Sequence, residues 1–523
     1  MTDPSESSTA PFIAPEDRPT RGVWPLLLAA AILAALTLFR LWYITRIELV
    51  PDEAYYWVWS KHLAASYRDK GPAVAWVIAL GNYGFGNTVF GVRFFAVILS
   101  ACTSWQLFVL ARRLAGNRNA LWCLILANLI PLLAVGSLLM TIDILSLFCW
   151  AWGMNVFWNA IHTRKLWLWI ALGIIVGLGF LAKFTNGLQL LCIVAFLCWS
   201  KPHRSLVFSK FTVAMGIAFS IAILPIVWWN IQTGWIHAAA LHSRSGVESS
   251  FHIRPLELLR FIGGQILVLS PLIGIGLIAA LVGTCWKDHR DLQARFLLCH
   301  CLPVYAVFGF FSLNHAGKEN WAAPALIAGI VILTVYWRRI AARCWRVLVT
   351  CKLRWCTLYD AVMDLACVLC VVGVAAALGL ACLATVVLHN TDYLHLPSKY
   401  EPLRRAQGWS DFTEHVQRAR TEHNATLLIG NHYSQASMMQ FYLPDQPATY
   451  LPEQAYGQNQ FTLWPSYQIN DHPQALFVTD KPDDLLPESL LRDFPKCDVV
   501  DDFWSQHQGR DMTHFKIYLC HRN

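Results

Sequence analysis

Charged residues bracket one short stretch of this chain, PDEAYYWVWSKHLAASYRDKGP, which runs over residues 51–72. Asp52 and Glu53 open the stretch, and Asp69 and Lys70 lie near its end. A carboxylate can take a proton from a hydroxyl group as a general base, and it can also ligate a divalent ion. A lysine can neutralise a phosphate as a point charge. The stretch therefore carries groups suited to chemistry on a phosphorylated substrate.

The same residues also have a purely structural explanation. Proline is tolerated in the first turn of a helix and acids there favour the helix dipole, so Pro51, Asp52 and Glu53 predict a helix start. The residues AYYWVWSKHLA continue it as an aromatic-rich helix, too short and polar to span a bilayer, which we expect to lie along the membrane surface. Asp69 and Lys70 predict a turn, where such a pair is usually solvated.

Five further residues could act with this stretch. Asp143, in MTIDILSL, opens an apolar segment, where an acid is either a functional group or a helix N-terminal acid. Lys183, in LAKFTN, either reaches the membrane interface or faces a polar cavity. His242 and Arg244 lie in LHSRSG, and Lys318 lies in NHAGKENW. A lone histidine is usually not a ligand, so each of these signals is weak by itself.

The composition is that of a membrane protein. The chain has 523 residues, of which 56% are hydrophobic and 14% charged, and it contains 24 tryptophans. A soluble protein carries about 25% charged residues. Tryptophan and tyrosine suit the membrane interfaces. The formal net charge is +8, but no basic patch is interleaved with aromatic residues, so we expect no nucleic-acid partner.

About eleven apolar segments predict a polytopic α-helical membrane protein. A spanning helix needs roughly 20 apolar residues. The candidate spans are 23–41, 89–111, 119–137, 141–160, 166–182, 186–200, 211–229, 258–283, 296–313, 321–340 and 360–388. The apolar stretch from Val23 is expected to be the first span rather than a cleavable signal peptide.

Lysine and arginine are concentrated in alternate connections, most strongly between 338 and 354. Connections rich in these residues are usually cytoplasmic. This predicts a disordered cytoplasmic tail over 1–22, a membrane domain over 23–388 with an outer loop over 42–88, and a C-terminus outside. Every residue singled out above then falls on or beside the outer face. This gathering of charges is what a phosphate-bearing lipid substrate would require.

The tail, 389–523, predicts a soluble α/β domain on that outer side. WSDFTEHVQRARTEH has helical spacing of its apolar residues, and ATLLIGN, ALFVTD and FKIYLC are typical of short strands. Cys497 and Cys520 lie in this region and could form a disulfide, because disulfides persist outside the cytoplasm. Most of the other cysteines among the 16 lie in apolar segments, where they are expected to act as small buried side chains.

Several of these stretches occur in an order that resembles a known family. They are PDEAYYWVWSKHLAASYRDKGPAVAW, GVRFFAVILSA, TIDILSLF, LAKFTN, PIVWWNIQTGW and KENWAAPA. They resemble the GT-C superfamily of membrane glycosyltransferases, and in particular the bacterial family 39 group that is similar to protein O-mannosyltransferases and lipid A aminoarabinose transferases. The resemblance covers the chain from about Val23 to the C-terminal domain, and the acidic first loop is its most specific part.

The resemblance implies an inverting glycosyltransferase of the bacterial inner membrane. Its donor would be a sugar on a polyprenyl phosphate, and its acceptor a lipid A or other glycolipid, a glycan or a protein at the outer face. It implies Asp52 as catalytic base with Glu53 in support, and Asp143 as the intramembrane acid. The leaving phosphate needs charge neutralisation, which Lys70, Lys183, Arg244, Lys318 or a divalent metal ion could supply.

The sequence departs from the family pattern in one place. Gly71 separates Lys70 from Pro72, where the aminoarabinose transferases have lysine directly before proline. His242 could match an outer-loop histidine that joins a metal site in some relatives, with Asp69 as a second ligand. Whether the protein needs a metal is therefore left open.

Two other classes of protein stay open at this point. In a transporter or flippase, Asp143 and Lys183 would form a coupled intramembrane pair. Against this class, the halves show no repeat and much of the unusual sequence lies in outer loops. In a non-catalytic scaffold, the tail would bind a partner. Release of polyprenyl phosphate from a donor lipid in the presence of acceptor separates the three.

Overall fold

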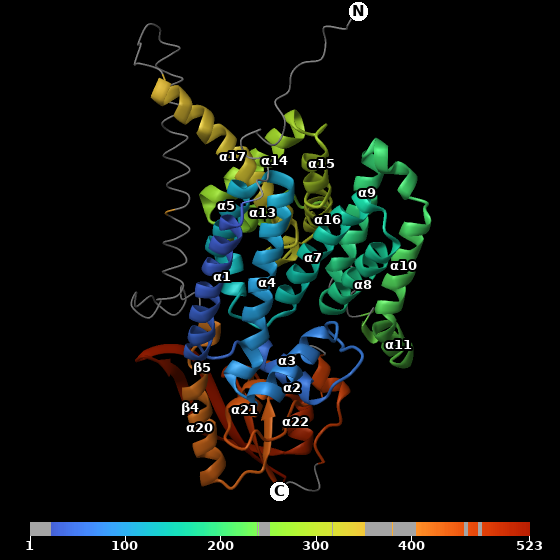
Figure 1. Ribbon diagram of the computed structural model, residues 1–523. Coiled ribbons are helices and arrows are strands. Elements are labelled where there is room, and N and C mark those ends of the chain that lie inside the picture. The colour runs from blue at the N-terminus through green and yellow to red at the C-terminus, as the bar shows by residue number, and fades with distance from the viewer. Residues whose placement is uncertain are drawn as a thin grey trace, which may run out of the picture.

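The computed structural model describes residues 22–237, 239, 252–315, 317–350, 379, 404–453, 459–468 and 473–522. Apolar helices form a bundle, and a β-sheet with its own helices lies at one end of this bundle (Figure 1). Two short helices, α2 (Pro51–Lys61) and α3 (Ala73–Phe85), lie between the two parts. Much of the charged stretch 51–72 therefore lies at the junction between the helix bundle and the sheet.

Five helices in the described ranges are long and apolar enough to cross a membrane, or up to seven if two bent helix pairs each count as one span. The five are α1 (Trp24–Tyr43), α4 (Val89–Ala115), α7 (Ile142–Thr163), the joined pair α15 (Leu292–Cys299) and α16 (Leu302–Ser312), and α17 (Ala325–Thr350). Many apolar helices were expected and are present. The total of about eleven stays a prediction, and almost all of the candidate span 360–388 lies outside the described residues.

Several of the predicted spans are interrupted beside a proline, and two show this most clearly. The segment 119–137 forms α5 (Asn117–Leu129) and a short α6 (Pro131–Gly136), and Ile130 between them is extended. The segment predicted as one span over 258–283 is not a single straight helix: α13 (Pro255–Val268) and α14 (Pro271–Lys287) meet at 113°. Proline disfavours the helical conformation in the residue before it. Ser270, directly before Pro271, lies outside both helices and has a φ of 78°.

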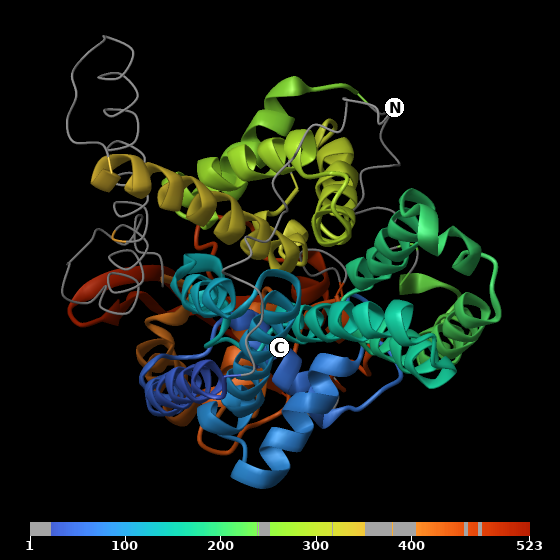
Figure 2. The same cartoon turned by 45° about the horizontal axis from the view of Figure 1, so that its top comes forward.

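The break expected at Lys183 is present. α8 (Leu166–Ala182) ends directly before it, a short 3-10 turn follows, and α9 (Leu188–Trp199) begins after that turn. α10 (Lys210–Ala222) and α11 (Leu224–Gln232) bend by 46° and pack beside α8. Helices α8 to α11 form one flank of the bundle, and α1 lies on the other (Figures 1 and 2).

The sheet is built from the C-terminal residues and is covered by short helices. Its strands are β1 (Leu427–Gly430), β2 (Thr449–Tyr450), β3 (Gln474–Thr479), β4 (Lys496–His507) and β5 (Arg510–His521), in the order β2-β1-β3-β5-β4. β1 is parallel to β2 and β3, whereas β5 is antiparallel to β3 and β4. Its helices are α20 (Trp409–Glu422), α21 (Tyr433–Tyr442) and α22 (Glu488–Asp493). The three short strands and the helix anticipated in the tail lie within these elements.

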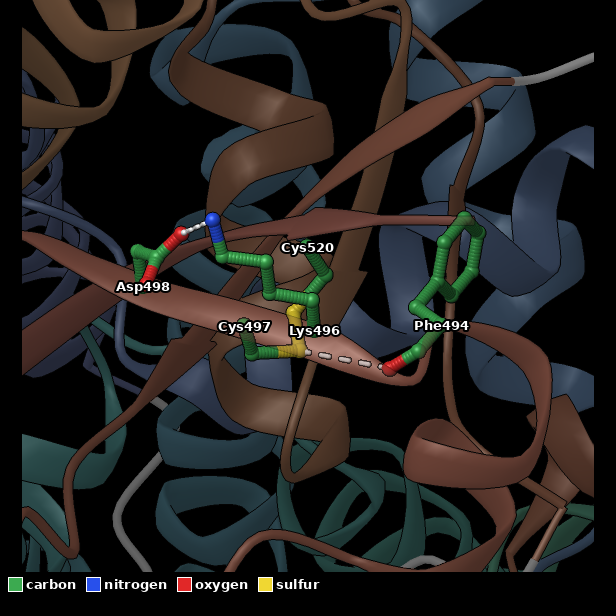
Figure 3. The surroundings of a disulfide bond; sticks show 5 residues. All are labelled: Phe494, Lys496, Cys497, Asp498 and Cys520. Atoms are coloured by element: carbon green, nitrogen blue, oxygen red, sulfur yellow. Dashed lines mark hydrogen bonds and ion pairs between the residues drawn. A yellow bond between two sulfur atoms is a disulfide. The ribbon is translucent and has the colours of Figure 1, made fainter. Parts of the chain in front are cut away.

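A disulfide joins the two long strands of this sheet. Cys497 on β4 and Cys520 on β5 are directly opposite each other in the antiparallel register, and their sulfur atoms are bonded. Figure 3 shows the bond beside the ion pair of Lys496 and Asp498, whose charged atoms are 3.3 Å apart. The cross-link that the sequence left open is therefore formed.

The α2 helix starts at Pro51 as expected, but it does not lie on an open membrane surface. Tyr55, Tyr56, Trp57 and Trp59 are all buried, at 6% exposure or less. One reason is that α21 of the C-terminal part packs against α2. An amphipathic pattern describes a helix with one free face, whereas this helix is enclosed by protein on most sides.

Candidate active site

Asp52 and Glu53 are neighbours in the first turn of α2, but their surroundings are opposite. Successive residues of a helix point in different directions. The side chain of Asp52 keeps 35% of its surface exposed, whereas Glu53 and its partner Arg93 are fully buried. Asp52 is therefore the accessible carboxylate of the two.

Glu53 is held by groups of the protein on both of its oxygens. Arg93, on α4, donates to Oε1 from Nε at 2.8 Å and to Oε2 from an Nη at 2.6 Å. The backbone N–H groups of Val50 and Met140 donate to the same carboxylate at 3.1 and 2.8 Å. A buried charge is tolerated when it is paired and hydrogen-bonded in this way. The structure thus gives Glu53 an anchoring position, which differs from the supporting catalytic role implied by the resemblance.

Arg93 uses its remaining donors to fix the chain that leads into α2. It donates to the carbonyl oxygens of Ile44, Ile47 and Glu48 at 2.8–3.0 Å. All five of its N–H donors are therefore satisfied. The segment before α2 is tied to α4, and the position of Asp52 follows from this anchor. Arg93 was not singled out from the sequence, although a charged residue inside an apolar segment is a signal that could have identified it.

Two side chains from the C-terminal part contact Asp52. The Tyr433 hydroxyl donates to Oδ1 at 3.1 Å, and the Arg405 guanidinium donates to Oδ2 at 3.2 Å. Tyr433 begins α21, and Arg405 lies in the turn that precedes α20. Neither residue carried a sequence signal, because both are more than 350 positions away from Asp52 along the chain.

Asp143 and Lys183 form a second charged group at the end of the bundle. Lys183 Nζ lies 2.6 Å from Asp143 Oδ1 and also donates to the Asn320 carbonyl oxygen at 3.1 Å. The Asn320 side chain donates to Asp143 Oδ2 at 2.7 Å. An ammonium has three donors, so one donor of Lys183 is not used in these contacts. The pair foreseen for a transporter exists, but it is also suited to holding a lysine beside a phosphate.

The Asp69–Lys70 turn packs against the end of α8, beside Lys183. A Cβ atom added to Gly71 would lie 1.9 Å from the backbone oxygen of Leu181, so only glycine fits this approach. Asp69 accepts a hydrogen bond from the Tyr55 hydroxyl at 3.3 Å. The residue that separates Lys70 from Pro72 is therefore a packing requirement that brings the turn to the site.

The tyrosines of α2 and α21 connect the three acids. Burial raises the pKa of Tyr56 well above its usual value, and the charges of Asp52 and Asp143 raise it further. Burial likewise raises the pKa of Tyr433, to which Asp52 and, more weakly, Asp69 contribute. Both phenols are therefore neutral at physiological pH and can donate hydrogen bonds. Tyr433 donates to Asp52, and Tyr55, whose ring stacks on that of Tyr433, donates to Asp69, so these two acids lie close together.

A cavity of about 370 Å³ lies among the helices of the bundle, with Asp143 in its wall. Asp143, Thr141 and Asn320 line it together with residues of α4, α5, α6 and α17. Most of the remaining lining is apolar, such as Leu107, Leu132, Leu147 and Ile327, with Ser100, Thr103, Ser104 and Asn128 as polar exceptions. A ligand with a polar head and an apolar tail fits this distribution.

The other predicted residues are placed as follows. Lys318 is exposed, directly before a 3-10 turn that contains Asn320. His242 and Arg244 lie outside the described residues. Among the residues that are described, no group of three or more His, Cys, Asp or Glu could hold a metal ion. The described part of the chain thus provides no complete metal site around Asp69.

The fold and the site define a multi-span membrane protein that carries acids and a lysine where the bundle meets the sheet. The crystallised ArnT of Cupriavidus metallidurans bound to undecaprenyl phosphate has the same fold, with a TM-score of 0.61 at 15% identity over 95% of this chain and 98% of that chain. An oligosaccharyltransferase of Archaeoglobus fulgidus matches with a TM-score of 0.52 at 13% identity, over 85% and 67% of the two chains. The chain therefore shares the fold of these two membrane proteins.

Sequence comparisons point to the same group. Residues 69–229 match the model of the dolichyl-phosphate-mannose-protein mannosyltransferase family. The lipid A galacturonosyltransferase RgtD of Rhizobium johnstonii is 25% identical over 308 residues, which are 56% of this chain and 63% of that protein. An undecaprenyl phosphate-alpha-4-amino-4-deoxy-L-arabinose arabinosyl transferase of Pseudomonas aeruginosa is 27% identical over 342 residues, 59% and 58% of the two. Each match spans less than two thirds of the relative's length. The resemblance to the GT-C glycosyltransferases that the sequence motifs indicated is confirmed.

Proposed function

We propose that this protein transfers a sugar from a polyprenyl-phosphate carrier to an acceptor in the bacterial envelope. The observation that carries the proposal is a partly exposed carboxylate, Asp52, in a helix turn that is hydrogen-bonded to Met140, three residues before Asp143, which lines a largely apolar cavity. The named activities of the similar proteins, a lipid A galacturonosyltransferase and an arabinosyl transferase that uses an undecaprenyl-phosphate sugar, support this class of donor. They also favour lipid A or a related glycolipid as acceptor over a glycan or a protein.

In the proposed reaction, Asp52 accepts the proton of the acceptor hydroxyl as its oxygen attacks the anomeric carbon. The bond from that carbon to the carrier's phosphate oxygen breaks, and the phosphate leaves with the electron pair. Because attack comes from the face opposite the phosphate, the anomeric configuration inverts. A single base is sufficient, since a phosphate is a good leaving group that needs neutralisation rather than a proton.

Lys183 is the cation best placed for this neutralisation among the described residues. Asp143 and Asn320 hold its ammonium group at the polar end of the cavity, with one donor left over. The Asp69–Lys70 turn, packed beside it, supplies a second candidate. Lys318, and Arg244 outside the described residues, complete the predicted set. Asp143 thus acts as a positioning residue, and the apolar length of the cavity suits the polyprenyl chain.

A divalent ion bound by Asp69 and His242 stays a prediction. The described residues do not offer a full set of ligands, so no step of the proposed reaction depends on a metal. The prediction is tested by dialysis against a chelator: unchanged transfer would contradict a metal requirement, and recovery of lost transfer by an added divalent ion would support it.

We further propose that the site faces the periplasm, with the N-terminus in the cytoplasm and the C-terminal sheet outside. The Cys497–Cys520 disulfide supports this, because disulfides persist in oxidising compartments. The basic residues support it too: Arg112 and Arg113 end α4 at the end of the bundle away from the sheet. Basic residues concentrate on the cytoplasmic side of membrane proteins.

The decisive experiment measures release of polyprenyl phosphate by the purified protein in lipid nanodiscs. The donor is undecaprenyl-phosphate 4-amino-4-deoxy-L-arabinose or polyprenyl-phosphate sugars extracted from the envelope, and the acceptor is lipid A. We expect product only when both lipids are present. Asp52→Asn should reduce the rate at least 100-fold, because it removes the general base.

The matched control is Asp445→Asn, which alters an aspartate of the C-terminal part that pairs with Arg420. This variant should transfer at the wild-type rate. Full activity of Asp52→Asn would exclude Asp52 as the base. If the wild-type protein moved lipid or solute across vesicles but transferred no sugar, the transporter reading would replace this proposal.

A further inference from the structure

The contacts of Asp52 present a difficulty for a general base. Its two oxygens are both engaged: Oδ1 accepts from the Tyr433 hydroxyl and Oδ2 from the Arg405 guanidinium. Each carboxylate oxygen has two lone pairs, so displacement of either partner would open a further position on Asp52 for the proton of an acceptor hydroxyl.

Tyr433 is the partner of Asp52 whose side chain is held in place by packing. Its ring stacks on Tyr55 of α2 with centroids 4.5 Å apart and an angle of 29°. It begins α21, and the His432 side chain and Gln435 cap that helix. A neutral hydroxyl also orients a carboxylate without neutralising its charge. Tyr433 is therefore suited to holding Asp52 throughout the reaction.

Arg405 is the partner that can leave. Its side chain is 66% exposed, and exposed ion pairs of this kind are weak. Its backbone, by contrast, is fixed. The Trp409 indole donates to the Arg405 carbonyl oxygen at 3.0 Å. The backbone N–H groups of Trp409 and Ser410, at the start of α20, donate to the Glu48 carboxylate. A fixed backbone with a long, exposed side chain allows the guanidinium to swing away and return to the same place.

We propose that Arg405 is a displaceable guard of Asp52, which covers Oδ2 until an acceptor takes its place. The guard suppresses a wasteful reaction. With Oδ2 free and no acceptor bound, Asp52 could take a proton from water while the water oxygen attacks the anomeric carbon. The bond from that carbon to the phosphate oxygen would break, and free sugar and polyprenyl phosphate would form. This inference rests on the proposed function and adds that the C-terminal part couples transfer to acceptor binding.

The test measures free sugar released from the donor lipid without acceptor, in nanodiscs, with the donor that the wild-type protein uses for transfer. Arg405→Ala should hydrolyse the donor about tenfold faster than wild type, because general-base activation of water becomes available. Arg405→Lys should restore low hydrolysis. Arg404→Ala, at the exposed neighbouring position, is the matched control and should hydrolyse as wild type does.

A double variant separates this mechanism from loosened folding. Asp52→Asn combined with Arg405→Ala should lose the extra hydrolysis, since the released base is absent. The inference is overturned if Arg405→Ala transfers sugar but hydrolyses no faster than wild type, or if the double variant keeps the extra hydrolysis. If Arg405→Ala does not fold, Arg405→Gln is the substitute. Failure of the wild type to consume donor even with acceptor would instead overturn the proposed function, and this inference with it.

Discussion

At the scale of single residues, adjacent acids have separate tasks in this site. Asp52 and Glu53 occupy equivalent positions in sequence terms, since both are acids in a first helical turn. The rotation of the helix directs one toward the C-terminal part and the other toward Arg93 of α4. One carboxylate is left partly accessible for chemistry, and the other is used to anchor the helix that carries it.

Glu53→Gln should destabilise the protein. Removing one partner of a buried ion pair leaves a buried charge uncompensated, at a cost of about 3–5 kcal/mol. We expect a lower thermal midpoint in detergent, measured by intrinsic fluorescence, together with a lower transfer rate. Adding Arg93→Met should recover part of the lost stability. A single variant with an unchanged midpoint would contradict the anchoring role.

Tyr433→Phe keeps the stacked ring and removes only the hydroxyl. Loss of a hydrogen bond to a charged group costs about 1.5–3 kcal/mol, so kcat should fall roughly 10- to 100-fold. The pKa of Tyr433 is raised by burial and by Asp52, so its neutral, donating form persists beyond the usual phenol pKa of about 10.

The ratio of wild-type to Tyr433→Phe rates should therefore stay constant from pH 7 to about pH 10. A raised pKa in the folded protein means that the donor is lost only above that range. Rates measured across this pH series test the prediction. Convergence of the two rates below about pH 9 would mean that the phenol ionises early and that its pKa is not raised.

At the scale of elements, a helix of the C-terminal part is capped by a residue of the first loop. The N-terminus of α20 begins after Gly408, and its first two free N–H groups, of Trp409 and Ser410, donate to the Glu48 carboxylate at 2.8 and 2.9 Å. Helix N-termini favour such an acceptor and a negative charge. Glu48 therefore joins two segments that are distant in sequence, and it fixes the backbone beside Arg405.

Replacing Glu48 by alanine should loosen α20 without unfolding the bundle. Loss of an N-terminal cap costs about 1 kcal/mol. Hydrogen exchange followed by mass spectrometry should show faster exchange in the first turn of α20, while peptides from α4 and α7 keep their wild-type rates. Glu414→Ala, at an exposed position on the same helix, is the control. Equal exchange in wild type and Glu48→Ala would exclude this contact in solution.

At the scale of the whole molecule, the bundle and the sheet share one site at their junction. The bundle supplies Asp143 and Lys183, the outer loop supplies Asp52, and the C-terminal part supplies Arg405 and Tyr433. Such a shared site requires the sheet to lie on the same side of the membrane as the first loop. The disulfide makes that side testable.

Cys497 and Cys520 should be protected from thiol reagents until a reductant is added. In cells with a permeabilised outer membrane, a membrane-impermeant reductant followed by an impermeant maleimide should add two labels to the protein. These labels should be absent from the Cys497→Ser and Cys520→Ser double variant. Labelling that appears only after the inner membrane is broken would place the sheet in the cytoplasm and contradict the proposed orientation.

Local patterns in the sequence were sufficient for much of the fold. The start of α2 at Pro51, the break at Lys183 and the short strands of the tail all follow from proline, polar interruptions and apolar runs. The breaks at Ile130 and Ser270 were missed because an apolar run does not reveal how far the chain bends at a proline. The enclosure of α2 was missed because a helix on a membrane surface and a helix covered by a second layer of protein can have the same aromatic-rich sequence.

The sequence by itself determined the class of the molecule and its best candidate for a base, because composition and a short acidic motif are local properties of the chain. The tertiary structure alone decided how the charges are used. It placed Glu53 with Arg93, Asp143 with Lys183, and Arg405 with Tyr433 on Asp52. The physical reason is that a charge acts on what lies within a few ångströms of it, and those neighbours come from positions 40 to 381 residues away along the chain.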